Sequence, residues 1–313
     1  MKLGNAIRLI VLFALFNGCT NSGEKVSVVS DVTAGFGKSA VWNPQMGQLC
    51  WVDVTGKILN LYNPVLGMHR ELYLGQLVFS VAPIETGELL VLLENDVYTL
   101  NPTTGTKLLL ASFPEALGNI LQAVGAVDPD GRFWVSITSK EEGTATTLFR
   151  IEEAEVAVII DRGIGMSGGM SWSADKTLLY YLDSEERRLI SFAYDLQTGS
   201  IGQPGKAVLL DSETGIPTGV ASDLDGNLWI GQWGISAISC YNPLNGEILS
   251  TIDLPVNYST SLTFGDSDMG TLYITSAKTN LDGELLSDNG TDGRLLRVRP
   301  QVGGATASVI SNL

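Results

Sequence analysis

The chain has 313 residues, of which 44% are hydrophobic and 17% are charged, and it carries a net charge of −15. This apolar content excludes a chain that stays disordered throughout. Acidic residues outnumber basic ones by 34 to 19 and no Lys/Arg-rich block occurs, which argues against a nucleic-acid partner. Three cysteines and one histidine exclude a disulfide-rich scaffold and a Cys/His zinc cluster.

The N-terminal residues have the pattern of an export signal. Lys2 and Arg8 flank the apolar run of residues 9–16, which is too short to cross a bilayer, because a membrane span needs about 20 residues. The Gly-Cys pair that follows resembles a bacterial lipoprotein cleavage site with Cys19 as the lipidated residue; an ordinary signal peptide cut nearby is the alternative. Either interpretation predicts a signal peptide over residues 1–18 and an exported protein: a periplasmic or outer-surface lipoprotein, or a secreted protein. Its only membrane contact would be the lipid.

The rest of the chain repeats one pattern, in which a short apolar stretch, a turn and an alternating strand follow one another. Equivalent positions recur every 40–50 residues, at Trp42, Ala82, Val127, Trp172, Ser222 and Phe264. Such a period, built from four short strands, is typical of a β-propeller blade. The six units predict an all-β, six-bladed β-propeller that forms one domain over residues 31–313, after a short polar linker over residues 19–30.

Several local patterns have structural rather than functional explanations. The Asp-x-Asp-Gly sequences at 128–131 and 223–226 suit hairpin turns, which favour the same residues as calcium loops. Cys50 and Cys240 lie in apolar, strand-like runs and are expected to be buried free thiols. The lone His69 is expected in a solvated turn, and without a second histidine or a Gly-x-Ser-x-Gly elbow a serine-hydrolase triad has no support.

The repeats also carry a family resemblance that covers nearly the whole chain after the N-terminal segment. The parallel stretches are 36–42 (F-G-K-S-A-V-W, against L-G-E-S-P-V-W in the family), 127–134 (V-D-P-D-G-R-F-W, unchanged), 167–173 (S-G-G-M-S-W-S, against S-N-G-L-A-W-S), 179–184, 217–220 (P-T-G-V, against P-D-G-M), 226–229 (G-N-L-W) and 272–278. Together they resemble the gluconolactonase, regucalcin and luciferin-regenerating enzyme superfamily of six-bladed propellers.

This resemblance implies a hydrolase of sugar lactones or related cyclic esters. Members of the family bind one divalent cation, often calcium or zinc, in a central pocket, where it polarises the carbonyl group and lowers the pKa of the attacking water. The resemblance places the metal ligands at four positions of this sequence, which are Lys38, Ala123, Gly168 and Thr218.

Each of these positions precedes its repeat anchor by four residues, so the six blades should contribute one layer around the axis. The layer is expected to contain Lys38, Val78, Ala123, Gly168, Thr218 and Thr260. It has no carboxylate or carboxamide, and the Lys38 ammonium would repel a cation, so we expect no metal site and no cofactor. A metal site rebuilt by carboxylates of the rim loops is an alternative with no spacing argument behind it. The carboxylates in question are Asp183, Glu185, Asp266, Asp282 and Glu284.

Lys38 is the candidate functional residue. Its ammonium could take the place of the metal and bind an anionic or carbonyl group, or its pKa could fall far enough to make it a base or nucleophile. In the simpler interpretation it only neutralises acidic neighbours or points to solvent. The hydroxyls of Ser167, Thr218 and Thr260 are candidate pocket groups beside it, although such hydroxyls are common at strand ends.

These observations leave two main functions open, and a propeller that binds proteins through its faces is a third option that no exposed motif supports. The first is a diverged family member that binds a sugar-like or lactone-like small molecule without a metal. The second is a lactone hydrolase that uses a relocated metal or Lys38. In both cases we expect a monomer whose partner is a small molecule, possibly derived from a carbohydrate, and no nucleic-acid partner.

Overall fold

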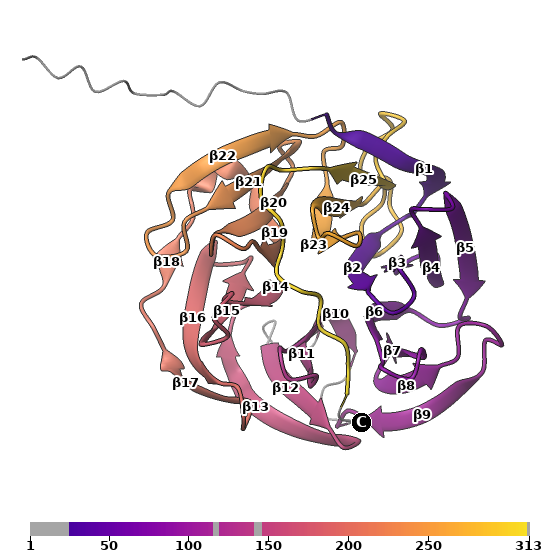
Figure 1. Ribbon diagram of the computed structural model, residues 1–313, viewed down its shortest axis with the longest axis horizontal. Helices are drawn as coiled ribbons and strands as arrows, with labels where there is room; N and C mark the ends of the chain where they lie inside the picture. Colours follow the sequence, from indigo (N-terminus) through magenta and orange to yellow (C-terminus); the bar gives the residue numbers. More distant parts are fainter. Residues whose placement is uncertain (1–24, 115–118, 141–145, 312–313) are drawn as a thin grey trace, which may run out of the picture.

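The computed structural model describes residues 25–114, 119–140 and 146–311 and shows six antiparallel sheets arranged around a central axis. Figure 1 looks down this axis and shows the sheets as blades of a ring. The predicted all-β, six-bladed β-propeller is therefore confirmed. The described residues contain no α-helix, and their one helical element is a single 3-10 turn at Ser212–Thr214.

Five blades are built from strands that follow one another along the chain. Blade 1 contains β2 (Gly37–Asn43), β3 (Gln48–Asp53), β4 (Ile58–Asn63) and β5 (Met68–Tyr73); blade 2 contains β6 (Val78–Pro83), β7 (Leu89–Leu93), β8 (Asp96–Leu100) and β9 (Lys107–Ser112); blade 3 contains β10 (Ile120–Val127), β11 (Phe133–Ser139), β12 (Thr146–Glu152) and β13 (Glu155–Ile164); blade 4 contains β14 (Ser167–Trp172), β15 (Leu178–Asp183), β16 (Arg188–Asp195) and β17 (Ser200–Pro204), with β18 (Val208–Leu209) also pairing with β16; blade 5 contains β19 (Ile216–Ser222), β20 (Leu228–Trp233), β21 (Ala237–Tyr241) and β22 (Ile248–Asp253).

The sixth blade closes the ring by joining the two ends of the chain. It contains β23 (Ser259–Gly265), β24 (Thr271–Ser276) and β25 (Arg294–Val298), and its outer strand is the N-terminal β1 (Ser27–Thr33), which pairs antiparallel with β25. β1 begins inside the segment 19–30 to which the sequence assigned a linker, so the propeller starts at Ser27. The expected signal peptide and Cys19 lie outside the described residues.

The inner strand of every blade has an irregular register at its N-terminal end. The six inner strands are β2, β6, β10, β14, β19 and β23, and each contains one of the six repeat anchors found in the sequence. In each of them the pairing with the next strand shifts, as it does between Val78 and Ser80 or between Thr218 and Val220. Such bulges redirect side chains locally and are frequent beside functional sites.

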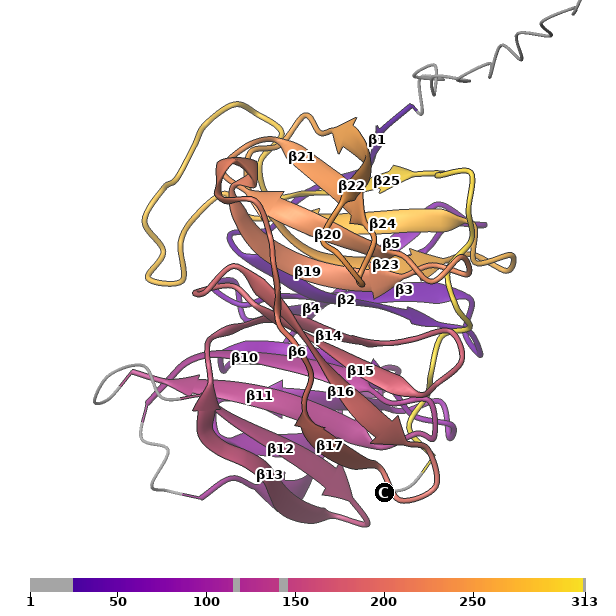
Figure 2. The ribbon, with the colours of Figure 1, turned by 90° about the vertical axis from the view of Figure 1, so that its left-hand side faces the viewer.

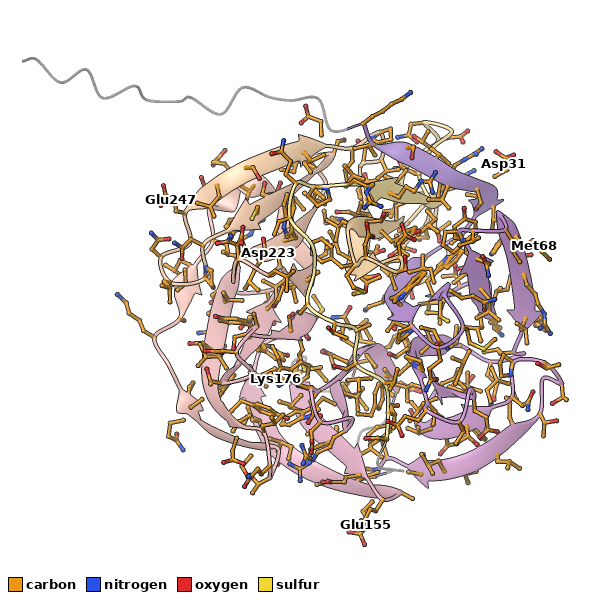
Figure 3. All side chains as sticks on the ribbon, in the orientation of Figure 1. Asp31, Met68, Glu155, Lys176, Asp223 and Glu247 are labelled. Carbon is orange, nitrogen blue, oxygen red and sulfur yellow. The ribbon has the colours of Figure 1, made fainter. Side chains whose placement is uncertain are left out.

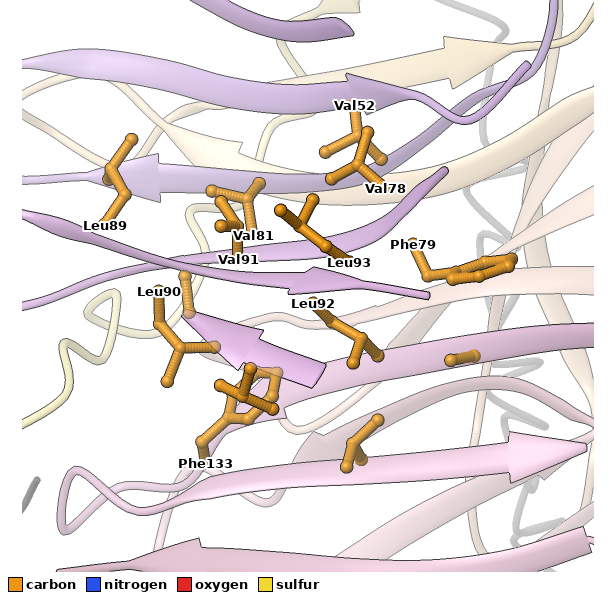
Figure 4. Packing of buried hydrophobic residues seen from close by; sticks show 14 of the residues in the cluster. Val52, Val78, Phe79, Val81, Leu89, Leu90, Val91, Leu92, Leu93 and Phe133 are labelled. Carbon is orange, nitrogen blue, oxygen red and sulfur yellow. The ribbon is translucent and has the colours of Figure 1, made fainter. Parts of the chain in front are cut away.

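The hydrophobic core lies between the blades rather than at the centre of the ring. Alternating side chains of β7 face opposite neighbours: Val91 packs toward Val52 of blade 1, whereas Leu90 and Leu92 pack toward Phe133 of blade 3 (Figure 4). All five side chains are fully buried. Because each blade covers its neighbour on both faces, the ring must close before every blade is buried.

The aromatic anchors belong to this packing between blades. Trp42 stacks on Tyr273 with ring centroids 6.3 Å apart, and Trp172 makes edge contacts with Trp134 and Tyr194. Exposed side chains such as Met68, Glu155 and Glu247 lie at the periphery (Figure 3).

Two of the local predictions can be compared directly with the structure. Cys50 and Cys240 are free and buried, as predicted, and desolvation raises the pKa of each thiol to about 12. The prediction for His69 is wrong, because His69 lies in β5, stacks on Trp51 and has Nε2 3.0 Å from Asn60 Oδ1. Its desolvation at this position lowers its pKa.

Within the residues described, no helix combines the length and the apolar character that a membrane span requires.

Candidate functional site

A central cavity of about 640 Å³ runs along the propeller axis between the six inner strands. One end of it is formed by residues near the N-terminal ends of these strands, among them Lys38, Gly168 and Thr260. The other end is bounded by the turns that follow the strands and by residues 305–309 and 311 near the C-terminus. A volume of this size suits a small organic molecule.

The C-terminal strap, residues 303–311, crosses the ring over this second end (Figure 1). Figure 2 shows it on the face opposite the long connection between β24 and β25. Gly303 O accepts a hydrogen bond from Leu224 N in blade 5 at 2.9 Å, and Ile310 N donates to Pro83 O in blade 2 at 2.8 Å. The strap is therefore fixed on opposite sides of the ring and forms the floor of the cavity.

One glycine of the strap packs too closely for any side chain. A Cβ atom at Gly304 would lie 2.2 Å from both Cβ and Cγ of Phe264, whereas one at the adjacent Gly303 would meet nothing closer than 3.5 Å. We expect Gly304→Ala to displace the strap and to lower the free energy of unfolding by about 1–3 kcal/mol. Gly303→Ala is the matched control and should be nearly neutral in urea denaturation. Equal midpoints for the two variants would contradict this account of the strap.

Lys38 is buried at the end of the cavity opposite the strap. Its side chain is 7% exposed, and Nζ donates a hydrogen bond to Gln122 Oε1 at 3.1 Å. Gln122 Nε2 in turn donates to Ser167 O at 3.0 Å, which fixes the amide between blades 1 and 4. Desolvation lowers the pKa of Lys38 to about 8, and within the described residues it makes no salt bridge.

The sequence did not predict Gln122 as a site residue, because the repeat spacing pointed to its neighbour Ala123. The predicted layer used Ala123, whose side chain is fully buried and does not line the cavity. The signal available in the sequence was a polar residue one position before a predicted layer residue.

The six positions of the predicted layer fall into two groups. Lys38, Gly168 and Thr260 line the cavity, whereas in the other three blades the following residue lines it: Phe79, Val124 and Gly219. The position four residues before the anchor therefore lines the cavity in three blades, and in the other three the lining residue lies three before the anchor.

The three predicted hydroxyl groups are differently placed. Thr260 lines the cavity, but its Oγ1 donates a hydrogen bond to Gly37 O and contacts Thr275 Oγ1 at 2.8 Å. Thr218 Oγ1 donates to Ser259 O at 2.7 Å, and neither Thr218 nor the buried Ser167 is a lining residue. The structure therefore brings only Thr260 together with Lys38 at the cavity.

The carboxylates considered for a rebuilt metal site lie apart and have other partners. Asp183 is buried and accepts a hydrogen bond from Arg188 Nε at 2.9 Å, and Asp266 accepts one from Tyr273 at 2.8 Å. Asp282 is paired with Lys140 at 3.8 Å on the exposed β24–β25 connection. Across the described part of the chain, no group of three His, Cys, Asp or Glu side chains is arranged to hold a metal ion.

The fold and the central cavity define a six-bladed propeller with its candidate site on the axis, and sequence comparison agrees with this class. The model for the SMP-30/gluconolactonase/LRE-like region matches residues 36–278, so the chain belongs to this family.

Individual relatives match over most of their length. Regucalcin of Oryctolagus cuniculus is 30% identical over 284 residues, which cover 88% of this chain and 95% of that protein. YvrE of Bacillus subtilis, named as a candidate sugar lactone lactonase, is 27% identical over 277 residues, or 88% of this chain and 94% of YvrE.

Solved structures give the same architecture. A luciferin-regenerating enzyme superimposes with a TM-score of 0.83 at 25% identity, covering 93% of this chain and 100% of the enzyme. A regucalcin of Agrobacterium tumefaciens, described as a calcium-binding protein, superimposes with a TM-score of 0.81 at 20% identity, covering 93% and 98% of the two chains.

Proposed function

We propose that the protein binds a small molecule carrying a carboxylate or carbonyl group in its central cavity, through Lys38 and without a divalent cation. The observation that carries this proposal is the buried Lys38 side chain, which lines the cavity at a position where the family resemblance implies a metal-binding glutamate. An ammonium group with a neutral hydrogen-bond partner remains available to an anion or to a carbonyl oxygen.

The residues present do not fit the divalent cation that the family implies. Of the four implied ligand positions, Lys38 carries a positive charge, Ala123 and Gly168 have no donor atom, and the hydroxyl of Thr218 is bonded to a backbone carbonyl. A divalent ion about 4 Å from the ammonium would be repelled by about 8 kcal/mol at an effective dielectric constant of 20.

A single substitution would not restore the family's donor set. A Cβ atom at Gly168 would lie 2.5 Å from Ser184 Oγ and 2.9 Å from Pro217 O. Ser184 Oγ itself donates to Pro217 O at 2.6 Å, so this contact occupies the space that an asparagine side chain would need. The proposed loss of the metal site therefore involves the packing of blades 4 and 5 as well as the residue at position 38.

Metal content tests this proposal. The purified protein, incubated with calcium, zinc or manganese and then freed of unbound ions, should retain no metal by elemental analysis. Lys38→Glu should also retain none, because Ala123 and Gly168 still supply no oxygen. The calcium-binding regucalcin of Agrobacterium tumefaciens serves as the positive control. One equivalent of metal retained by the unmodified chain would overturn the proposal.

The second candidate, hydrolysis of a sugar lactone or related cyclic ester, is favoured by family membership and by the name of YvrE. Because the rim carboxylates do not converge, Lys38 is the residue available for this chemistry, as a neutral amine that accepts a proton from the attacking water. Chelator-resistant lactone hydrolysis that disappears in Lys38→Met would select this candidate over simple binding.

We also propose that the protein acts outside the cytoplasm as a monomer. The location outside the cytoplasm is supported by the signal-like pattern of residues 1–18, with Cys19 as the candidate lipidated residue.

A further inference from the structure

The wall of the cavity between Lys38 and the strap combines apolar side chains with serine and threonine hydroxyls. Along the axis the inner strands contribute Val41, Val81, Val124, Met170, Leu262 and Phe264. These side chains come from all blades except blade 5, which contributes Val220 and Ala221. A ligand that extends from Lys38 toward the strap therefore meets apolar side chains contributed by all six blades.

The hydroxyl groups of the wall already have partners in neighbouring strands. Ser39 Oγ lies 3.0 Å from Ser80 Oγ, and Ser171 Oγ lies 2.7 Å from Ser222 Oγ. Ser261 Oγ accepts a hydrogen bond from Ala40 N at 2.9 Å. Since these groups connect adjacent blades, they offer few unpaired side-chain partners to the several hydroxyls of a sugar.

The floor of the cavity has no charge of its own. The strap sequence G-G-A-T-A-S-V-I-S contains only small or aliphatic uncharged residues. The other charged residues that line the cavity are Glu85, Asp130 and Lys176, which lie in turns after the inner strands. Glu85 and Lys176 are exposed, and Lys176 is labelled in Figure 3. Lys38 is therefore the one buried cation among the residues that line the cavity.

We infer that the ligand of this cavity is a monocarboxylate with an apolar body, whose carboxylate binds Lys38 and whose body lies along the channel toward the strap. This inference rests on the proposed function and names its ligand class. The buried ammonium provides a charge-assisted hydrogen bond at one end. Burial of the apolar body against the wall provides the remaining affinity, which a polyhydroxylated acid of similar size cannot obtain.

Calorimetric titration with two matched carboxylates tests the inference. Octanoate and gluconate carry the same head group, but one has an aliphatic body and the other a polyol. Octanoate should bind at least tenfold more tightly than gluconate. Lys38→Met should lower the affinity for octanoate at least tenfold. Lys206→Met, which removes an exposed lysine, should leave both affinities unchanged. Val124→Thr adds a hydroxyl to the wall without changing the size of the side chain, and it should lower the affinity for octanoate severalfold.

The outcomes separate this inference from the proposal on which it rests. Gluconate that binds as tightly as octanoate, with both dependent on Lys38, would overturn the apolar ligand class and leave the Lys38 site standing. Octanoate binding that is unchanged in Lys38→Met would overturn the assigned orientation. The absence of Lys38-dependent binding for either acid, in a variant whose circular dichroism shows the native fold, would overturn both.

Discussion

Asp128→Ala is expected to lower the free energy of unfolding by about 3–5 kcal/mol, because Asp128 is the fully buried partner of a buried arginine. Its Oδ2 accepts hydrogen bonds from Tyr194 at 2.7 Å, from Trp134 Nε1 at 2.9 Å and from Arg132 at 3.3 Å. Alanine would leave the Trp134 and Tyr194 donors unpaired and would remove one counter-charge from Arg132, which is 3% exposed. Thermal and urea denaturation would measure the loss, and the midpoint temperature should fall by about 10 °C.

The equivalent turn of blade 5 provides a matched control. Asp223 accepts a hydrogen bond from Trp229 Nε1 at 3.1 Å in the same arrangement but has no arginine beside it. Asp223→Ala should therefore cost about 1–3 kcal/mol, less than Asp128→Ala. Equal losses would show that the contribution of Arg132 has been misjudged. The carboxylates of both turns are bonded to indole groups of their own blades, which supports the interpretation of these sequences as structural turns.

Lys38→Met is expected to make the protein more stable by about 2 kcal/mol at pH 7. Burial lowers the pKa of Lys38 from 10.5 to about 8, so keeping its charge in the folded state costs about 3 kcal/mol. The loss of the hydrogen bond to Gln122 offsets about 1 kcal/mol of the gain.

The difference in stability between Lys38→Met and the wild type should decrease as the pH rises. Between pH 8 and about 10.5 the unfolded chain binds more protons at Lys38 than the folded protein, so this residue makes the wild type more stable as the pH rises. The burial cost should be complete well below pH 8 and should vanish above pH 10.5, where the lost hydrogen bond to Gln122 leaves the variant less stable by about 1 kcal/mol. Urea titrations at pH 7 and pH 10.5 measure it, with Lys206→Met as the control for an exposed lysine. A variant less stable than the wild type at pH 7 would contradict the assigned burial cost.

A lysine that lowers stability at its position is consistent with a binding role. The cavity would be more stable with an apolar residue at position 38, and the single neutral partner Gln122 only partly compensates the charge. A ligand carboxylate would supply the missing counter-charge. The octanoate titration and the Lys38→Met stability measurement therefore both depend on the cost of burying the Lys38 charge.

The blade architecture could be predicted from local sequence. Turn residues and alternating strands recur at each of the six anchors. They recur because every blade reverses the chain at its turns and packs apolar side chains against the neighbouring blade. The buried thiols of Cys50 and Cys240 follow from the same alternation. His69 was misplaced because its turn-like neighbours, Gly67 and Met68, lie at the start of an outer strand where the stacking of His69 on Trp51 is a tertiary contact.

The candidate site could be predicted only in part. The motif around Lys38 identified the residue, and the structure places it at the cavity. At the cavity the residues that follow Val78, Ala123 and Thr218 take the expected places, and in β6 and β19 the register shifts directly after Val78 and Thr218. Bulge positions depend on the pairing with the next strand, which no single strand sequence specifies.

The amino-acid sequence by itself determined the number of blades and their construction from short strands, since turns and alternation act over a few residues. It also showed a lysine where the family resemblance implies a metal ligand. Only the tertiary structure decided the pairing of β1 with β25, the hydrogen bond between Lys38 and Gln122 and the strap across the cavity floor. Each of these joins residues that are distant in the chain, and closure of the ring is the physical event that brings them together.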